Sequence, residues 1–231
     1  MPFDGTKPAI RPLARAAGEG RGVLPQAPLG LEESAAAEPR DWGSAAAFAL
    51  WRAGGSEDPR PLALVTVKTW RAERGGFSAR GLEALGIDPA GVIQVRAERE
   101  IEALWALEEA LKSGAVRGAV GTVEQASLVA TRRLDFAARE GRAIGVLLRI
   151  SGGGDLSAAR LRWRLKAGSS APHPFDPKAP GAARITAELA RRRDGPLGAW
   201  DLEQDHETHR LRLAAGLADH GLVQGGRTHA A

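Results

Sequence analysis

The fold is decided by four apolar runs, LALVTV (62–67), GVIQV (91–95), VRGAVGTV (116–123) and AIGVLLRI (143–150). Each run is short, and helix-like stretches lie between them. Strands that alternate with helices through short links assemble naturally by right-handed parallel crossovers. The sequence therefore predicts an α/β fold in which helices flank a mostly parallel sheet.

Four helices are predicted from the apolar period and from residues that start or stop helices. They are SAAAFALWRA (44–53), ARGLEALGI (79–87), EREIEALWALEEALKSG (98–114) and EQASLVATRRLDFAAREG (124–141). Ser44 is expected to cap the first of them. In the third, one stripe is expected to face the core, formed by Ile101, Leu104, Leu107 and Leu111.

The chain divides into three stretches and a tail. Residues 1–40 are rich in Pro, Gly and Ala and are predicted to form a flexible arm. Residues 41–215 are predicted to form one domain, with the α/β core at 41–150 and C-terminal strands at 151–215. These strands include LRWRL and a hairpin that turns at Asp194-Gly195, so antiparallel strands are expected to extend the sheet. Residues 216–231 are predicted to be a disordered tail.

Composition narrows the class of protein. The chain has 231 residues, 43% of them hydrophobic, and no cysteine. Disulfides and thiolate metal sites are therefore excluded, which favours a reducing cytoplasm. No apolar run approaches the roughly 20 residues of a membrane span, so no membrane partner is expected. The net charge of +4 favours acidic partners or nucleic acid, although the large excess of arginine over lysine also fits biased coding composition.

Nucleotide chemistry is the function that such a scaffold normally supports, at the C-terminal ends of the parallel strands. The chain contains no Gly-Lys pair, so it has no GxxxxGK[ST] loop. The run GAVRGAV is followed by Gly121-Thr122, where a metal-holding aspartate would be needed. Gly43-Ser44, at the start of the first helix, is interpreted as a vestigial phosphate-loop position, and Asp41 beside it adds an opposing charge. No cofactor and no metal are predicted.

Three further groups could supply catalysis, and each has a simpler interpretation. Glu73 is predicted to be a solvated glutamate in an Arg-rich loop, and Glu124 to complement the charge at a helix start. The sequence HETH (206–209), with Asp205, lacks the HExxH spacing of zinc proteases and is predicted to be a turn. The sequence therefore argues against ATP hydrolysis and predicts no catalytic residue.

Basic residues concentrate on the C-terminal strands. Alternation in ARLRWRLKA places Leu161, Trp163 and Leu165 on one face and the cations on the other. If the neighbouring strand lies beside it, a cationic face results, formed by Arg160, Arg162, Arg164, Lys166, Arg191, Arg192 and Arg193. This face could contact DNA phosphates or an acidic partner, or it could be a solvated edge that blocks aggregation. No exposed aromatic residue is evident for base stacking, which counts against single-stranded DNA.

Several ordered blocks resemble a known family. The block GLEALGIDPAGVIQVRAEREIEALWALEEALKSGAVRGAVGTV (81–123) is similar to the core of RecA-type recombinases. The blocks EREIEALWALEEALKSGAV, GTVEQASLVATRRLDFAAREG, GVLLRI, LRWRL and WDLEQDHETHRLRLA together resemble the ImuA family, over roughly residues 38–215. These proteins are RecA-like accessory factors of damage-induced mutagenesis in bacteria.

The resemblance implies a RecA-like fold and a non-catalytic role in SOS-induced, error-prone translesion DNA synthesis. It implies partnership with an ImuB-type Y-family polymerase homologue, and it makes RecA and DNA further candidate partners. It also implies expression in the cytoplasm. Two alternatives stay open: an ATP-binding RecA-like ATPase that uses Glu73 or Glu124, and a SulA-like inhibitor of cell division.

Overall fold

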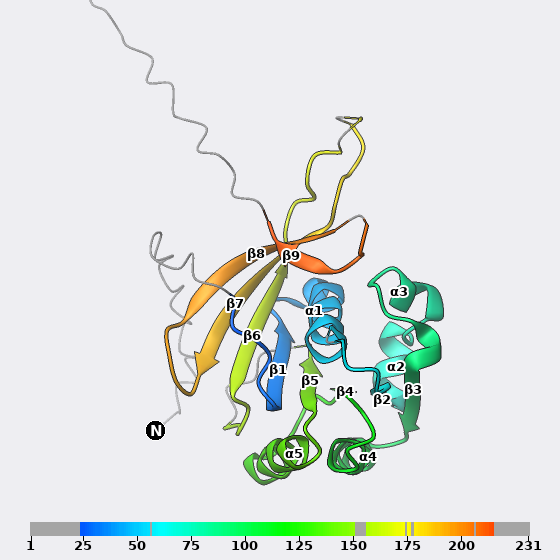
Figure 1. Ribbon diagram of the computed structural model, residues 1–231, viewed down its shortest axis with the longest axis vertical. Helices are drawn as coiled ribbons and strands as arrows, with labels where there is room; N and C mark the ends of the chain where they lie inside the picture. Colours follow the sequence, from blue (N-terminus) through cyan, green and yellow to red (C-terminus); the bar gives the residue numbers. More distant parts are fainter. Residues whose placement is uncertain are drawn as a thin grey trace, which may run out of the picture.

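Nine strands form one sheet in a computed structural model of the chain, which describes residues 24–55, 57–150, 156–173, 175–176, 178–205 and 207–214. The strand order is β3-β2-β4-β5-β1-β6-β7-β8-β9 (Figure 1). The strands are β1 (Gly30–Ala36), β2 (Leu62–Val67), β3 (Val92–Ala97), β4 (Gly118–Thr122), β5 (Ile144–Arg149), β6 (Leu161–Ala167), β7 (Arg184–Arg192), β8 (Gly198–Gln204) and β9 (Leu211–Leu213). The helices are α1 (Trp42–Gly54), α2 (Lys68–Arg74), α3 (Ala79–Glu83), α4 (Glu100–Lys112) and α5 (Leu128–Glu140), with 3-10 turns at Pro39–Asp41 and Pro89–Gly91.

The predicted fold class is confirmed. Strands β3, β2, β4, β5, β1 and β6 run parallel to one another. Strands β7, β8 and β9 extend the sheet beyond β6 by antiparallel pairing. The four apolar runs that predicted strands correspond to β2, β3, β4 and β5, and the hairpin prediction corresponds to β7 and β8.

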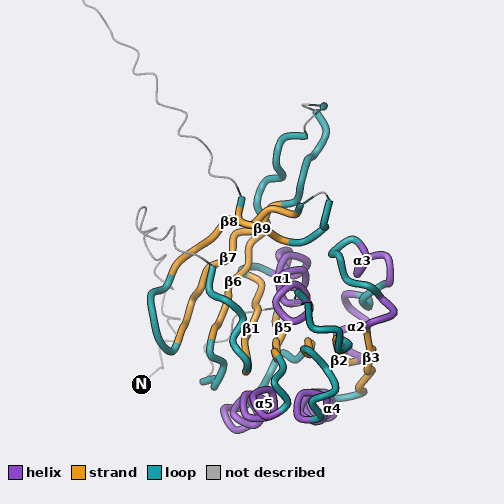
Figure 2. The backbone as a smooth tube through the Cα atoms, in the orientation of Figure 1, coloured by secondary structure: helices purple, strands orange, loops and turns teal. Residues whose placement is uncertain are grey.

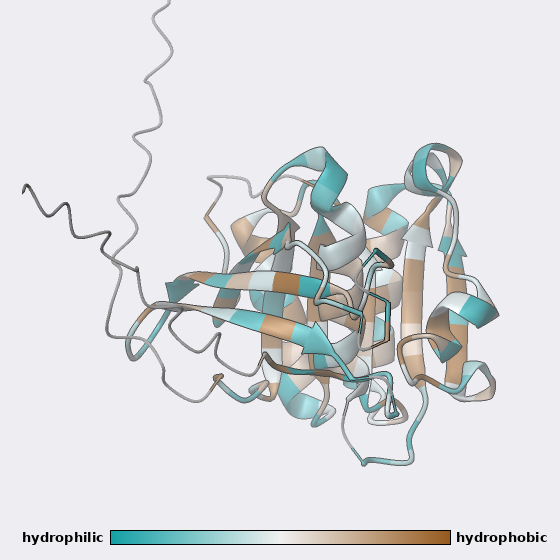
Figure 3. Ribbon diagram, turned by 90° about the horizontal axis from the view of Figure 1, so that it is seen from above, coloured by the Kyte–Doolittle hydropathy of each residue, from teal (hydrophilic) through white to brown (hydrophobic). Residues whose placement is uncertain are grey.

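Helices cover both faces of the parallel part of the sheet. Helices α4 and α5 lie side by side on one face, and α1 packs on the other face against β1, β5 and β6 (Figures 1 and 2). Figure 3 shows hydrophobic residues along the parallel strands and mixed colouring along the long antiparallel strands. The core therefore lies under the helices, and the antiparallel end of the sheet is more polar.

Strand β1 lies in the middle of the sheet, between β5 and β6, and all of its residues are buried. The prediction of a flexible arm over residues 1–40 is therefore wrong from Gly30 onward, and the domain begins before residue 41. Residues 1–23 of the predicted arm, and residues 215–231 with the predicted tail, lie outside the described part of the chain. The sequence GLEESAA did not predict a strand because polar residues fill its middle, whereas buried parallel strands normally have continuous apolar runs.

The buried carboxylate of Glu32 is paired with Arg52 of α1. Arg52 Nε and Nη2 donate to the two carboxylate oxygens at 3.0 and 2.6 Å. Trp163 Nε1 donates to the same carboxylate at 3.0 Å, and Arg52 Nη1 donates to the carbonyl of Pro25 at 2.6 Å. Burial raises the pKa of Glu32, and the adjacent guanidinium opposes this effect. This bidentate pair makes a glutamate tolerable on the α1 face of a central strand.

Glu33 points to the opposite face, because successive side chains of a strand alternate. Its carboxylate accepts from Arg162 Nε at 2.7 Å and from Ser157 Oγ at 2.6 Å. Arg149 Nη2 lies 3.4 Å from the same carboxylate, and both side chains are almost completely buried. Strand β1 is therefore held by one ionic cluster on each face of the sheet.

The described residues form five helices, of which four were predicted, and the ends of the predicted helices need correction. Helix α1 begins at Trp42 with Asp41 as its N-cap, so the predicted cap at Ser44 is wrong. The segment around Glu73 was predicted to be a loop, but residues 68–74 form α2. Helix α3 ends at Glu83 instead of residue 87, and α5 begins at Leu128 with Ser127 as its cap.

Helix α4 buries a different stripe from the predicted one. Its buried residues are Ala103, Leu107 and Leu111, whereas Ile101 is 64% exposed and Leu104 is half-buried. The buried positions are four residues apart, so the core line includes Leu107 and Leu111 but passes through Ala103, two positions from Ile101. The apolar side chains left outside, including Trp105, therefore lie on the surface of α4.

None of the helices in the described residues has both the length and the apolar content that crossing a bilayer requires.

Candidate functional site

The connection from β1 to α1 is the place where doubly wound nucleotide-binding folds hold phosphate. Here Asp41 lies at that helix start and is 2% exposed. Its carboxylate accepts from the Glu38 amide and from the Ala167 amide, both at 3.1 Å. Gly43 and Ser44, the predicted vestigial position, lie in the first turn of α1. The chain's own carboxylate thus provides the negative charge at this helix end and would repel a phosphate.

We expect Asp41→Ala to lower the free energy of unfolding by about 1–2 kcal/mol, because two amide groups lose their acceptor. Asp41→Asn keeps a carbonyl oxygen as an acceptor and should lose less. Urea denaturation followed by circular dichroism measures both variants. An Asp41→Ala protein as stable as the wild type would show that this carboxylate has no structural role.

The end of β4 is shaped for packing, in the place where an NTPase would need a metal-holding aspartate. A Cβ atom on Gly121 would lie 2.2 Å from Leu107 Cδ1, so α4 can approach the sheet only because this residue is glycine. Thr122 Oγ1 accepts from the amide of Val67 at 3.2 Å and links β4 to β2. Gly121 and Thr122 therefore both have structural roles, one in helix packing and one in a hydrogen bond between strands.

The two glutamates considered as catalytic bases, Glu73 and Glu124, each interact with other groups of the protein. Glu73 is a solvated residue of α2, paired with its neighbour Arg74. Glu124 accepts from the Ile150 amide at 3.2 Å, and its own amide donates to Glu100 at 2.8 Å. Burial raises the pKa of Glu124. Glu124 therefore ties the loops after β4 and β5 together, and its predicted role at the start of a helix is wrong because Ser127 caps α5.

Glu207 and Thr208 of the HETH segment lie in a turn, as predicted. Asp205 accepts from the amides of Glu207 and Thr208 at 3.0 and 2.8 Å, and His209 adopts a positive φ of 56°. His206 lies outside the described residues. Within the described residues, no group of three acidic or histidine side chains is arranged to hold a metal ion.

Strands β6 and β7 lie side by side, which is the condition for the cationic face, and Trp163 is on the buried face as predicted. Two of the seven predicted cations are engaged inside the protein. Arg160 Nε lies 3.1 Å from Asp135, and Arg162 Nε lies 2.7 Å from Glu33. These two arginines therefore stabilise the junction between β1, β6 and α5, and much of their charge is compensated there.

The exposed cations on β6 face residues of mixed charge. Arg164 pairs across the ladder with Glu188, and Lys166 pairs with Thr186, which bonds Asp201 of β8. The open face of the antiparallel strands is therefore not the uniform cationic surface that the sequence suggested. Arg191 and Arg193 are exposed at the end of β7 and Arg192 is half-buried, and the contact role of all seven cations stays a prediction.

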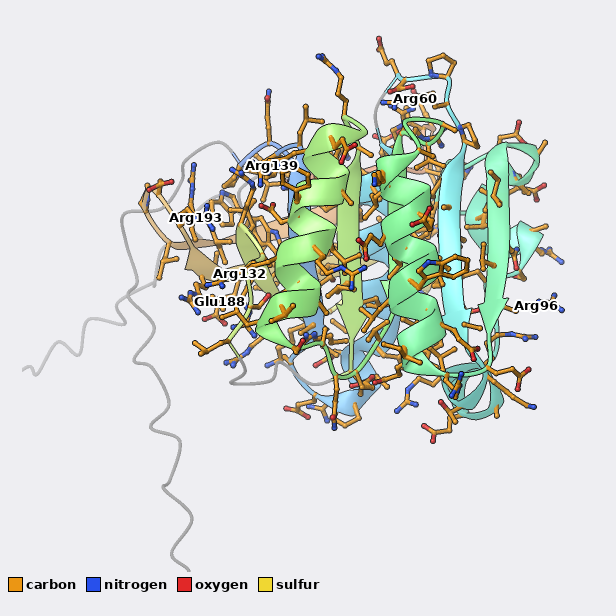
Figure 4. All side chains as sticks on the ribbon, turned by 90° about the horizontal axis from the view of Figure 1, so that it is seen from below. Arg60, Arg96, Arg132, Arg139, Glu188 and Arg193 are labelled. Atoms are coloured by element: carbon orange, nitrogen blue, oxygen red, sulfur yellow. The ribbon has the colours of Figure 1, made fainter. Side chains whose placement is uncertain are left out.

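The exposed apolar residues of α4 and α5 form a surface that the sequence did not reveal. Trp105 is 64% exposed and Phe136 is 62% exposed, whereas no exposed aromatic residue for base stacking was evident from the sequence of the basic strands. Figure 4 shows this face, with Arg132 and Arg139 beside α5 and Arg193 on the neighbouring segment. Arginine next to exposed aromatic side chains is typical of protein interfaces. A helical wheel of α4 would have placed Trp105 on the exposed side. This requires knowing which residues form the buried stripe, and the sequence predicted that stripe incorrectly.

Comparison with known proteins gives two curated relatives. The "Protein ImuA" of Caulobacter vibrioides strain NA1000 / CB15N is 38% identical over 207 residues, which cover 84% of this chain and 80% of that protein. The "Protein ImuA" of strain ATCC 19089 / CIP 103742 / CB 15 of the same species gives the same values. No family model matches the chain.

Two solved structures overlap partially with this fold. SulA from Pseudomonas aeruginosa has a TM-score of 0.45 and 23% identity, covering 54% of this chain and 100% of that one. A DnaB-like replicative helicase, described with its interactions with primase, has a TM-score of 0.48 and 15% identity, covering 79% of this chain and 56% of that one. Overlaps of this size carry no argument about function.

Proposed function

The chain belongs to the ImuA family, and from this premise we propose that it is a non-catalytic accessory factor of SOS-induced, error-prone translesion DNA synthesis. It acts by binding an ImuB-type Y-family polymerase homologue in the cytoplasm. The family assignment comes from the curated relatives. The argument against catalysis comes from the residues at the start of α1 and at the end of β4.

The observation that carries the non-catalytic role is the buried carboxylate of Asp41. A phosphate at the start of α1 would have to displace hydrogen bonds that this carboxylate already makes with Glu38 and Ala167. It would also meet a like charge at short range, without the lysine that normally compensates it. The end of β4 offers Gly121 and Thr122 in place of a metal ligand. These features support a scaffold used for binding.

We expect the double variant Gly43→Ala, Ser44→Ala to keep wild-type damage-induced mutation frequency when it replaces the chromosomal copy. A Cβ on Gly43 meets no atom within 4 Å, and surface changes of this kind alter stability by about 0.5 kcal/mol or less. Calorimetry of the full-length protein with magnesium-ATP should show no binding at micromolar concentration. A folded variant that loses mutagenesis, or clear ATP binding by the wild type, would instead favour an ATPase.

Partner binding is tested directly by co-purification of the full-length chain with the Y-family polymerase homologue of the same bacterium. Deletion of the gene should lower damage-induced mutation, and expression of the chain should restore it. Filamentation of cells on overexpression, with no change in mutation frequency, would favour a SulA-like division inhibitor.

A further inference from the structure

A hollow of 520 Å³ lies between α5, the segment that precedes β6 and the C-terminal end of β7. Its rim carries four arginines and two apolar side chains: Arg132, Arg139, Arg191, Arg193, Phe136 and Leu156. Figure 4 shows Arg132, Arg139 and Arg193 on the same flank of α5. Three segments that are distant in sequence therefore bring these side chains to one place.

Positive charge in this hollow exceeds the negative charge available to it. Asp135 is the single acidic residue of its lining, and its carboxylate accepts from the Leu31 amide at 3.1 Å and pairs with Arg160 and Arg139 at 3.1 and 3.3 Å. The other three arginines of the rim are Arg132, Arg191 and Arg193. Within the described residues, none of these three has a carboxylate at salt-bridge distance. These three guanidinium groups are thus available to an anionic ligand.

Apolar surface lies among these charges. Phe136 is 62% exposed and Leu156 is 67% exposed. The guanidinium of Arg139 lies 5.6 Å from the centre of the Phe136 ring and packs over it. Exposed aromatic and aliphatic side chains with flanking arginines are the composition of the energetic centre of a protein interface.

The chemistry fits an acidic peptide better than a nucleic acid. A phosphate backbone needs a continuous basic track, whereas this hollow contains a leucine and the carboxylate of Asp135. A single-stranded nucleic acid also needs several free aromatic faces, and the ring of Phe136 is already covered by Arg139. A peptide can place carboxylates on Arg132, Arg191 and Arg193 and an apolar side chain against Leu156.

We propose that this hollow binds an acidic segment of the partner protein, with one apolar side chain inserted between Phe136 and Leu156. The proposal rests on the proposed function, because it names the surface through which partner binding takes place. Arginine pairs carboxylates with bidentate geometry, so the rim supplies specificity for acidic residues as well as affinity.

The test compares full-length variants for binding to the full-length Y-family polymerase homologue by biolayer interferometry. The double variant Arg132→Glu, Arg193→Glu should weaken binding by on the order of ten-fold or more, because rim carboxylates would then repel the acidic segment. Phe136→Ala should weaken it separately. The matched control is Arg96→Glu, an exposed arginine of β3 at the other edge of the sheet (Figure 4), which should leave binding unchanged. Equal binding by wild type and double variant would overturn the inference and leave the proposed function standing.

A second measurement decides the inference even if the full-length proteins do not bind, a result that would count against the proposed function. Overlapping 15-residue peptides that cover the polymerase homologue are probed with wild type and with the double variant. The strongest wild-type signals should come from peptides that are acidic and contain Leu, Phe or Trp, and the double variant should lose them. Strongest signals from neutral or basic peptides, or no signal at all, would overturn the inference. So would a double variant that loses binding to a DNA oligonucleotide and keeps every peptide signal.

Discussion

Arg52→Ala should lower the free energy of unfolding by about 3–5 kcal/mol, because it leaves the buried carboxylate of Glu32 without its counter-charge. The side chains of Arg52 and Glu32 are 3% and 0% exposed, so water cannot replace the lost partner. The variant also loses the bond from Arg52 to the carbonyl of Pro25. Urea denaturation with the linear extrapolation gives the change directly.

Two controls separate this effect from a general effect of losing an arginine. Arg40→Ala removes an ion pair with Glu38 in which both side chains are largely exposed, and it should cost about 0–1 kcal/mol. The double variant Glu32→Leu, Arg52→Leu removes both charges and should recover much of the loss, since apolar residues often replace a buried pair at little cost. If Arg52→Ala were as stable as Arg40→Ala, the pair would not support β1.

Trp163→Ala is the second large effect, with an expected loss of about 3–5 kcal/mol. Trp163 is 2% exposed, and its ring packs edge-on against Phe48 and Trp200 with centroid separations of 5.1 and 5.7 Å. Its removal leaves a cavity between α1 and the antiparallel strands and takes a donor from Glu32. Thermal and urea unfolding should both report the loss.

Trp105→Ala is the matched control, because the same side chain is deleted from a surface where it is 64% exposed. Its expected cost is within about 0.5 kcal/mol, as for other surface substitutions. Trp163→Phe should fall between the two, since it keeps an aromatic ring but not the indole N–H. A Trp163→Ala protein as stable as Trp105→Ala would contradict the buried aromatic cluster.

The parallel core could be predicted from the sequence because its strands are apolar throughout. LALVTV was predicted with the correct ends, since a fully buried strand between two parallel neighbours needs an unbroken apolar run. The hairpin of β7 and β8 was predicted from alternation and a turn residue, which are also local signals.

Strand β1 could not be predicted because its stability is not local. Glu32 and Glu33 are acceptable only because Arg52, Arg149 and Arg162 reach them from other elements. Contacts between distant segments also explain why the candidate site was predicted incorrectly in part. Arg160 and Arg162 were expected to be available to a ligand, but their carboxylate partners come from segments whose position only the tertiary structure fixes.

The central position of β1 has a consequence for biosynthesis. It is the first strand of the sheet to leave the ribosome, yet Glu33 pairs with Arg162, which lies 129 residues later, and Glu32 bonds Trp163, which lies 131 residues later. Contacts of such long range form slowly, because the entropy of closing a large loop must be overcome first. The edge of β1 that pairs with β6 therefore stays open until most of the chain has been translated. A nascent or truncated chain that ends before β6 exposes this edge and lacks Arg162 as a partner of Glu33 and the Trp163 donor to Glu32.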